Sequence, residues 1–170
     1  MKRRSTLALL AQSSLLGLTG LSLSACGFKL RAAQNYAFDT IAIQPNPGGV
    51  LAIELRRTMG GTVRVLPLGE PLTQAQVVLD ILQELREKTV VGVTSTGQVR
   101  EFQLRIRVRY RVRTPQGKEL TPETEIVQKR DISFNESAVL AKEAEEVLLY
   151  RDMQSDIVQQ LLRRLAAVKY

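Results

Sequence analysis

A strict alternation of hydrophobic and polar residues between positions 102 and 113 is the clearest pattern in this chain. The hydrophobic set holds the even positions: Phe102, Leu104, Ile106, Val108, Tyr110 and Val112. The polar set holds the odd positions and is mostly arginine: Gln103, Arg105, Arg107, Arg109, Arg111 and Arg113. Because successive side chains of a strand point to opposite faces, the pattern predicts a long β-strand with one buried face and one arginine-rich face.

The residues after this strand predict a hairpin. A three-residue loop over 115–117 ends on Gly117, which suits a type I turn closed by a left-handed residue, and it sets Thr114 opposite Lys118. A second long strand then runs on to Phe134. The register gives three arginines acidic partners directly opposite them: Arg113 with Glu119, Arg109 with Glu123 and Arg107 with Glu125. The other two arginines face uncharged residues: Arg105 faces Val127 and Arg111 faces Thr121.

Weaker periodicity places the remaining elements. Residues 36–44 predict a strand ended by Pro45, residues 50–59 a short helix ended by Gly60 and Gly61, and residues 62–66 alternate weakly. Residues 76–86 fit a strand or a helix, and their β-branched continuation to position 93 favours one long strand followed by a turn at 94–98. The loop prediction covers residues 68–73.

A long amphipathic helix is predicted over residues 141–167. Its apolar stripe consists of Tyr150, Met153, Ile157, Leu161, Leu165 and Val168, flanked by Leu149, Val158 and Leu162. Glutamates open the helix and basic residues close it, as the helix dipole favours. Packing against the sheet is the favoured role for the stripe, because a sheet with one solvated face needs cover on the other. A helix that binds a partner or a membrane surface is the alternative.

The N-terminus has the pattern of an export signal for a lipoprotein. Basic residues at 2–4 precede a mostly apolar stretch over 7–23, and Leu23, Ser24 and Ala25 lead to Cys26, the only cysteine. We therefore expect residues 1–25 to be removed, Cys26 to carry an S-diacylglycerol and an N-acyl group, and residues 26–35 to tether one domain over 36–170. The alternative is a secreted protein whose cysteine is incidental. Gly27, rather than aspartate, follows the cysteine, which favours the outer membrane.

Composition narrows the function. The full chain has a net charge of +7, but Lys2, Arg3 and Arg4 leave with the signal, so the mature part carries +4, which suits an anionic lipid and does not argue for nucleic acid. The chain has no histidine and its one cysteine is assigned to the lipid, which removes the commonest general base, metal ligands and thiol nucleophile. We expect no enzyme, no metal and no cofactor.

The arginine row of the predicted strand, Arg105 to Arg113, allows two interpretations. Three of its five members have cross-strand acidic partners, which favours a solvated face that neutralises itself. Like charges about 7 Å apart along a strand nevertheless repel, and enclosing the face would call for further anions. A lipid phosphate or the acidic wall of a partner protein could supply them, so the five arginines are also the candidate anion-binding residues.

The order of these features resembles the LPS-assembly lipoprotein LptE family. The resemblance rests on the mature start (Cys26, Gly27, Phe28, Lys29, Leu30, Arg31), the arginine-rich hairpin, and the C-terminal helix with its residues 140–146, Met153, Gln160, Leu161, Arg164 and Leu165. It implies an α+β two-layer fold, a largely antiparallel four-stranded sheet with two helices packed on one face.

The resemblance also implies a role. An LptE-like protein is expected on the periplasmic side of the outer membrane, inside the β-barrel of LptD as a plug that helps assemble it and that assists insertion of lipopolysaccharide (LPS). It is further expected to bind LPS itself. Two alternatives remain: a lipoprotein that pilots another outer-membrane β-barrel or a secretin, and an envelope lipid carrier, which would need an enclosed apolar cavity.

Overall fold

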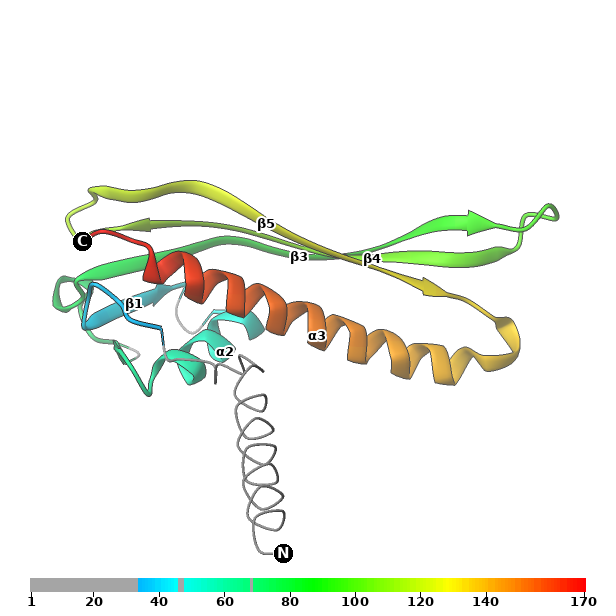
Figure 1. Ribbon diagram of the computed structural model, residues 1–170, viewed down its shortest axis with the longest axis horizontal. Helices are drawn as coiled ribbons and strands as arrows, with labels where there is room; N and C mark the ends of the chain where they lie inside the picture. The colour runs from blue at the N-terminus through cyan, green and yellow to red at the C-terminus, as the bar shows by residue number, and fades with distance from the viewer. Residues whose placement is uncertain (1–33, 46–47, 68) are drawn as a thin grey trace, which may run out of the picture. The chain divides into compact units, whose positions relative to one another are not determined.

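Three long strands and one long helix form most of the domain (Figure 1). The computed structural model describes residues 34–170 except 46, 47 and 68, so the predicted signal, Cys26 and most of the tether lie outside the described residues. The elements in chain order are β1 (Thr40–Gln44), α2 (Val50–Met59), β2 (Arg64–Val65), the 3-10 turn η2 (Leu72–Gln74), β3 (Val77–Val93), β4 (Val99–Arg113), β5 (Glu119–Ser133), the 3-10 turn η3 (Glu136–Ala138) and α3 (Val139–Ala166).

The strands form one sheet in the order β2-β1-β3-β4-β5. β3, β4 and β5 pair antiparallel, whereas β1 is parallel to both β2 and β3, with α2 crossing between β1 and β2. The α+β class, the long strand β3 and the helix over 50–59 are confirmed. The expected four strands were one too few, because the weakly alternating residues 62–66 contribute the two-residue strand β2.

Both helices cover one face of the sheet, and the hydrophobic core lies between the two layers (Figure 1). The predicted stripe of α3 is buried from Met153 onward, and Ile157, Leu161 and Leu165 are fully inaccessible to solvent. They meet the hydrophobic face of β4, where all residues from Leu104 to Val112 at even positions are buried. Core packing is therefore the role of the C-terminal part of this stripe.

The hairpin between β4 and β5 has the predicted loop but not the predicted register. Thr114 N–H donates to the Lys118 carbonyl (2.8 Å), and Gly117 has a φ of +96°. Two irregularities follow near Val112, which pairs with Thr121. Beyond them every pairing is displaced by two residues, so that Arg109 lies opposite Glu125 and Val108 opposite Ile126. A displacement by two keeps each side chain on its predicted face.

β3 contains a bulge that reverses the faces of the strand. The pairing with β4 slips between Ile81 and Gln83, so Leu82 is an extra residue. Before the bulge Leu79 and Ile81 point toward the helices; after it the residues opposite the core positions of β4 are Glu84, Arg86 and Lys88. The side chains of β3 that face α3 therefore change from apolar to charged along the strand.

Candidate functional site

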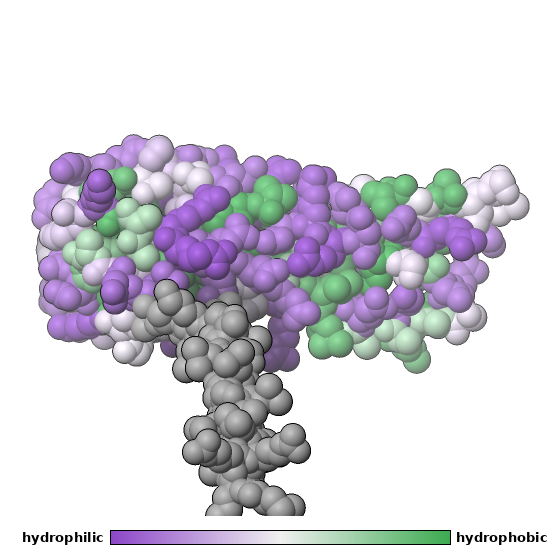
Figure 2. All heavy atoms as spheres, in the orientation of Figure 1, coloured by the Kyte–Doolittle hydropathy of each residue, from purple (hydrophilic) through white to green (hydrophobic). Residues whose placement is uncertain are grey.

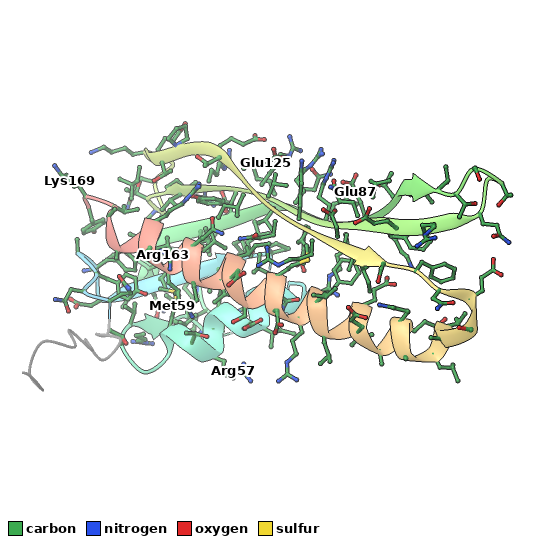
Figure 3. The ribbon with its side chains drawn as sticks, turned by 45° about the vertical axis from the view of Figure 1, so that its right-hand side comes forward. Arg57, Met59, Glu87, Glu125, Arg163 and Lys169 are labelled. Atoms are coloured by element: carbon green, nitrogen blue, oxygen red, sulfur yellow. The ribbon has the colours of Figure 1, made fainter. Side chains whose placement is uncertain are left out.

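Five of the six arginines of β4, those of the row Arg105 to Arg113, lie together on the sheet face that points away from the helices. Their side chains are between 20% exposed (Arg113) and 48% exposed (Arg111), which is typical of a half-covered sheet face. Two labelled carboxylates, Glu87 on β3 and Glu125 on β5, reach the same face from the strands on either side (Figure 3). The row is thus flanked by acidic residues on both neighbouring strands.

β5 supplies two of the carboxylates that the sequence predicts. Arg109 Nη1 lies 2.9 Å from Glu123 Oε1, and Arg107 Nε lies 3.2 Å from Glu125 Oε1. Both pairs are diagonal rather than directly opposite, since the register differs by two residues. Arginine is long enough to reach a diagonal neighbour, so the predicted partners hold although the predicted pairing does not.

Asp80 on β3 forms ion pairs with Arg111 and Arg113, the last two arginines of the row. Its Oδ2 accepts hydrogen bonds from Arg111 Nε and Arg113 Nε, each at 2.8 Å, and its Oδ1 lies 3.3 Å from Arg113 Nη2. Burial would raise the pKa of this carboxyl, but the hydrogen bonds and charges of the two arginines outweigh it and hold the pKa below its ordinary value. The expectation that Arg111 lacks a partner is wrong. Arg113 does lie opposite Glu119, yet its ion pair is with Asp80.

Glu87 on β3 pairs with Arg105 and Arg107, the first two arginines of the row, at longer distances. Its Oε2 lies 3.5 Å from Arg105 Nη1 and 3.9 Å from Arg107 Nη2, so the expectation that Arg105 lacks an acidic partner is also wrong. The Oε2 atom of Glu87 and the Nε atoms of Arg105 and Arg107 are buried without a well-aligned hydrogen bond inside the described chain. This is the least satisfied point of the row.

The residues that sequence reasoning missed are therefore Asp80 and Glu87. A signal for Glu87 was available, because the turn at 94–98 sets Val93 opposite Val99, and the same register puts Glu87 opposite Arg105. Asp80 could not be found in that way. It faces Arg111 only because the bulge at Leu82 shifts the register by one residue.

Chemically, this face is an array of ion pairs in which every arginine has a carboxylate within 4.0 Å. Its least satisfied end lies near Arg105 and Arg107. Among the described residues, no group of three or more histidine, cysteine, aspartate or glutamate side chains is placed to hold a metal ion. Within the same range, neither helix has the length and apolar character of a bilayer-spanning segment.

Comparison with known proteins places these features in a family. The model of the family described as "LptE: Lipopolysaccharide-assembly" matches residues 38–165. A relative from Photorhabdus laumondii, described as LPS-assembly lipoprotein LptE, is 30% identical over 161 residues, covering 91% of this chain and 84% of the relative. One from Yersinia enterocolitica with the same description is 28% identical over 157 residues, covering 91% and 74%.

The fold is also found among solved structures. The solution NMR structure of an uncharacterized lipoprotein B from Nitrosomonas europaea has a TM-score of 0.72 and 33% sequence identity to this chain. The similarity covers 83% of this chain and 91% of that one. The two-layer arrangement of sheet and helices is therefore shared over nearly the whole of that lipoprotein.

Proposed function

The chain belongs to the LptE family of lipopolysaccharide-assembly lipoproteins, and from that premise we propose that it plugs the β-barrel of LptD as a heterodimer and assists insertion of LPS into the outer leaflet. The role is one of assembly and contact, without a catalytic step. Family membership supports the general role in LPS assembly, and the properties of the sheet face support the finer one.

The observation that carries the plug proposal is the internal neutralisation of the arginine face. A domain enclosed by a barrel brings its outer surface close to another wall, where unpaired charges are costly. Here β3 and β5 supply carboxylates to all five arginines, so enclosure does not require anions from the barrel. The face remains polar, which suits a water-lined interior.

Contact with LPS belongs, in this proposal, to the arginine row Arg105, Arg107, Arg109, Arg111 and Arg113. Arg105 is its most favourable member, because its one carboxylate, Glu87, is 3.5 Å away and its buried Nε–H has no hydrogen-bond acceptor among the described residues. Arg107 is next, because it shares Glu87 at 3.9 Å and its Nε–H is poorly aligned with Glu125. A phosphate oxygen is a strong acceptor for guanidinium donors. Arg111 and Arg113 are held by Asp80 and contribute less.

The anchor in this proposal is the lipid on Cys26. Removal of residues 1–25 would make this cysteine the first residue, and two or more acyl chains give stable attachment where one does not. The domain over 36–170 would then stand on the periplasmic side of the outer membrane, tethered by residues 26–35.

A pull-down from solubilised outer membranes tests the partner. The tagged full-length protein, processed in the cell, is expected to retain a large β-barrel that mass spectrometry identifies as LptD. Recovery of another barrel or a secretin would favour the pilot role instead, and recovery of no barrel would refute the plug proposal. Intact mass of the purified protein reports acylation of Cys26 independently.

Binding of purified LPS tests the lipid contact. The double variant Arg105→Gln/Arg107→Gln is expected to bind LPS roughly tenfold more weakly, about 1.4 kcal/mol. The comparison variant is Arg109→Gln, which removes one arginine of the row that has its own close partner, Glu123, and is expected to weaken LPS binding by a smaller factor. Equal binding by the double variant and the unmodified protein would remove the row from the LPS contact.

A further inference from the structure

β3 has an unpaired edge along most of its length. β1 pairs with it only from Val77 to Asp80, and the chain then leaves the sheet toward α2. Among the described residues, no strand pairs with this side of β3 from Ile81 to Val93. The only side-chain hydrogen bond reaching the backbone of this stretch, within the same range, is from the Tyr150 hydroxyl to the Glu87 carbonyl (2.8 Å). An open row of backbone donors and acceptors is a template for another strand.

The two edges of the sheet are protected to different extents. β5 carries Pro122 within the strand, and Glu123, Lys129 and Arg130 distribute charge along it. Proline and charged residues are the usual means of blocking edge pairing. β3 has charged residues over 84–88 and a second register shift between Val90 and Val93, but its end over residues 89–93 has no charge. There Val90, Val91 and Val93 are 45%, 50% and 60% exposed.

The open edge of β3 continues into a groove between the two helices. One hollow of about 540 Å³ is lined by Pro45, Val50 and the β3 residues from Ile81 to Glu84 and Arg86. A second, of about 640 Å³, lies between α2 and α3 and shares Val50 and Arg86 with the first. Its apolar lining residues Ile53 and Val147 are 59% and 67% exposed. Figure 2 shows hydrophobic residues gathered on this face over the hairpin of β3 and β4 and along α3.

The charge of the groove indicates what kind of segment it receives. Arg86 bonds the neutral Gln154 side chain and lies 5.6 Å from the Tyr150 ring centre, and no carboxylate of the described chain forms an ion pair with it. The other charged residues that line the two hollows are Glu54, Glu84, Asp152, Arg57 and Arg151, and Glu54 accepts a hydrogen bond from Gln154. Arg86 thus lies beside an open strand edge without an acidic partner among the described residues.

From these features we propose that the β3 edge, residues 81–93, is a strand-addition site for an extended segment of a partner polypeptide. The segment has alternating β-branched, uncharged residues opposite 89–93 and a carboxylate over Arg86. Backbone hydrogen bonds give the affinity and the groove selects the side chains that enter it. This interaction is additional to the barrel-plug and LPS roles proposed above and does not depend on either.

A synthetic peptide of about ten residues provides the probe, long enough for one strand. It alternates valine and threonine and has one aspartate near an end. Binding is measured by fluorescence anisotropy with the full protein, and hydrogen exchange reports which amides become protected. Protection is expected over residues 81–93 and not over β5. A peptide with prolines at alternate positions, which cannot form the ladder, is expected not to bind.

Two matched variants locate the site. The double variant Val91→Lys/Val93→Lys changes exposed side chains of the open edge and is expected to weaken binding roughly tenfold or more, as edge lysines do. Val127→Lys introduces one lysine at a valine of β5 that is 39% exposed and is expected to leave binding unchanged. Replacing the peptide's aspartate with asparagine is expected to weaken binding several-fold.

Four results would overturn the proposal. They are absence of any peptide binding, equal binding of the proline peptide, equal weakening by Val127→Lys, and protection confined to residues outside 81–93. Self-association of the protein that is abolished by Val91→Lys/Val93→Lys would show instead that a second copy occupies the edge. Circular dichroism of each variant confirms that the fold is retained.

Discussion

The two halves of α3 lie against the same sheet but are held there by different forces. The packed half, residues 153–166, buries Met153, Ile157, Leu161 and Leu165 completely. The bridged half, residues 139–152, buries no side chain fully and is connected to the sheet by polar contacts. These are Lys88 Nζ to Glu146 Oε2 (2.6 Å), Lys142 Nζ to Ser133 Oγ (3.0 Å) and the Tyr150 hydroxyl to the Glu87 carbonyl (2.8 Å).

The two halves of α3 therefore differ in how much they stabilise the fold and in how much apolar surface they leave exposed. Apolar burial contributes on the order of 25 cal/mol per Å², whereas an exposed polar bridge contributes less than about 1 kcal/mol. The packed half therefore supplies most of the folding free energy of α3. The bridged half leaves Leu140, Val147 and Leu148 between 58% and 82% exposed, so its apolar surface is open to a partner.

The largest expected effect is the difference in stability between a variant at a buried leucine of the packed half and a variant at an exposed leucine of the bridged half. Leu161→Ala, at a fully buried position, is expected to lower the free energy of unfolding by about 3–4 kcal/mol, because it leaves a cavity in the core. Leu148→Ala, at a side chain that is 58% exposed, is expected to change it by less than about 0.5 kcal/mol. Urea denaturation of both variants measures the contrast, and similar losses would show that the bridged half is packed as tightly in solution.

A carboxylate of β3 on the other side of the sheet gives the next largest effect. Asp80→Asn is expected to cost about 2–3 kcal/mol, since two charge-assisted hydrogen bonds are lost at a side chain only 10% exposed. Glu87→Gln removes contacts of 3.5 and 3.9 Å from a side chain that is 33% exposed, so we expect a cost below about 1 kcal/mol.

The pH dependence of Asp80→Asn provides the control. The folded-state pKa of Asp80 lies below its ordinary value, so the unfolded chain takes up the proton first as the solution is acidified. The stabilisation is fully present above about pH 4, the ordinary pKa of aspartate, and is lost as the pH falls through the folded-state pKa. The difference between the unmodified protein and Asp80→Asn should therefore shrink below pH 4. A difference that stays constant would mean that Asp80 acts through packing rather than charge.

The smallest expected effect is the loss of the ion pair between Lys88 and Glu146, which connects the bridged half to the sheet. A double-mutant cycle with Lys88→Gln and Glu146→Gln is expected to give a coupling of about 0.5 kcal/mol, because the two side chains are 38% and 22% exposed. The coupling should fall at 1 M salt, where the screening length is about 3 Å. A coupling several times larger would place this bridge among the main stabilising contacts and would weaken the distinction between the halves.

Much of the architecture could be predicted because it depends on local periodicity. The α3 stripe, the helix over 50–59 and the loop at 115–117 each follow from residues close together in the chain, and all three were found. The partners of Arg105 and Arg111 were not found, because they depend on how β3 aligns with β4. That alignment includes an inserted residue, and neither strand alone shows where an insertion falls. Placement of Cys26 remains a prediction.

The bulge at Leu82 has a consequence for how sequences of this fold can change in length. Leu82 is the one residue of this stretch without a partner on β4, so deleting it would join Ile81 to Gln83 and leave Arg86 and Lys88 on the side of α3. Deleting a paired residue such as Leu85 would instead displace one part of β3 by one residue against β4 and move its side chains to the opposite face. We therefore expect related chains to tolerate the loss of one residue at position 82 far more readily than a single-residue gap elsewhere in β3.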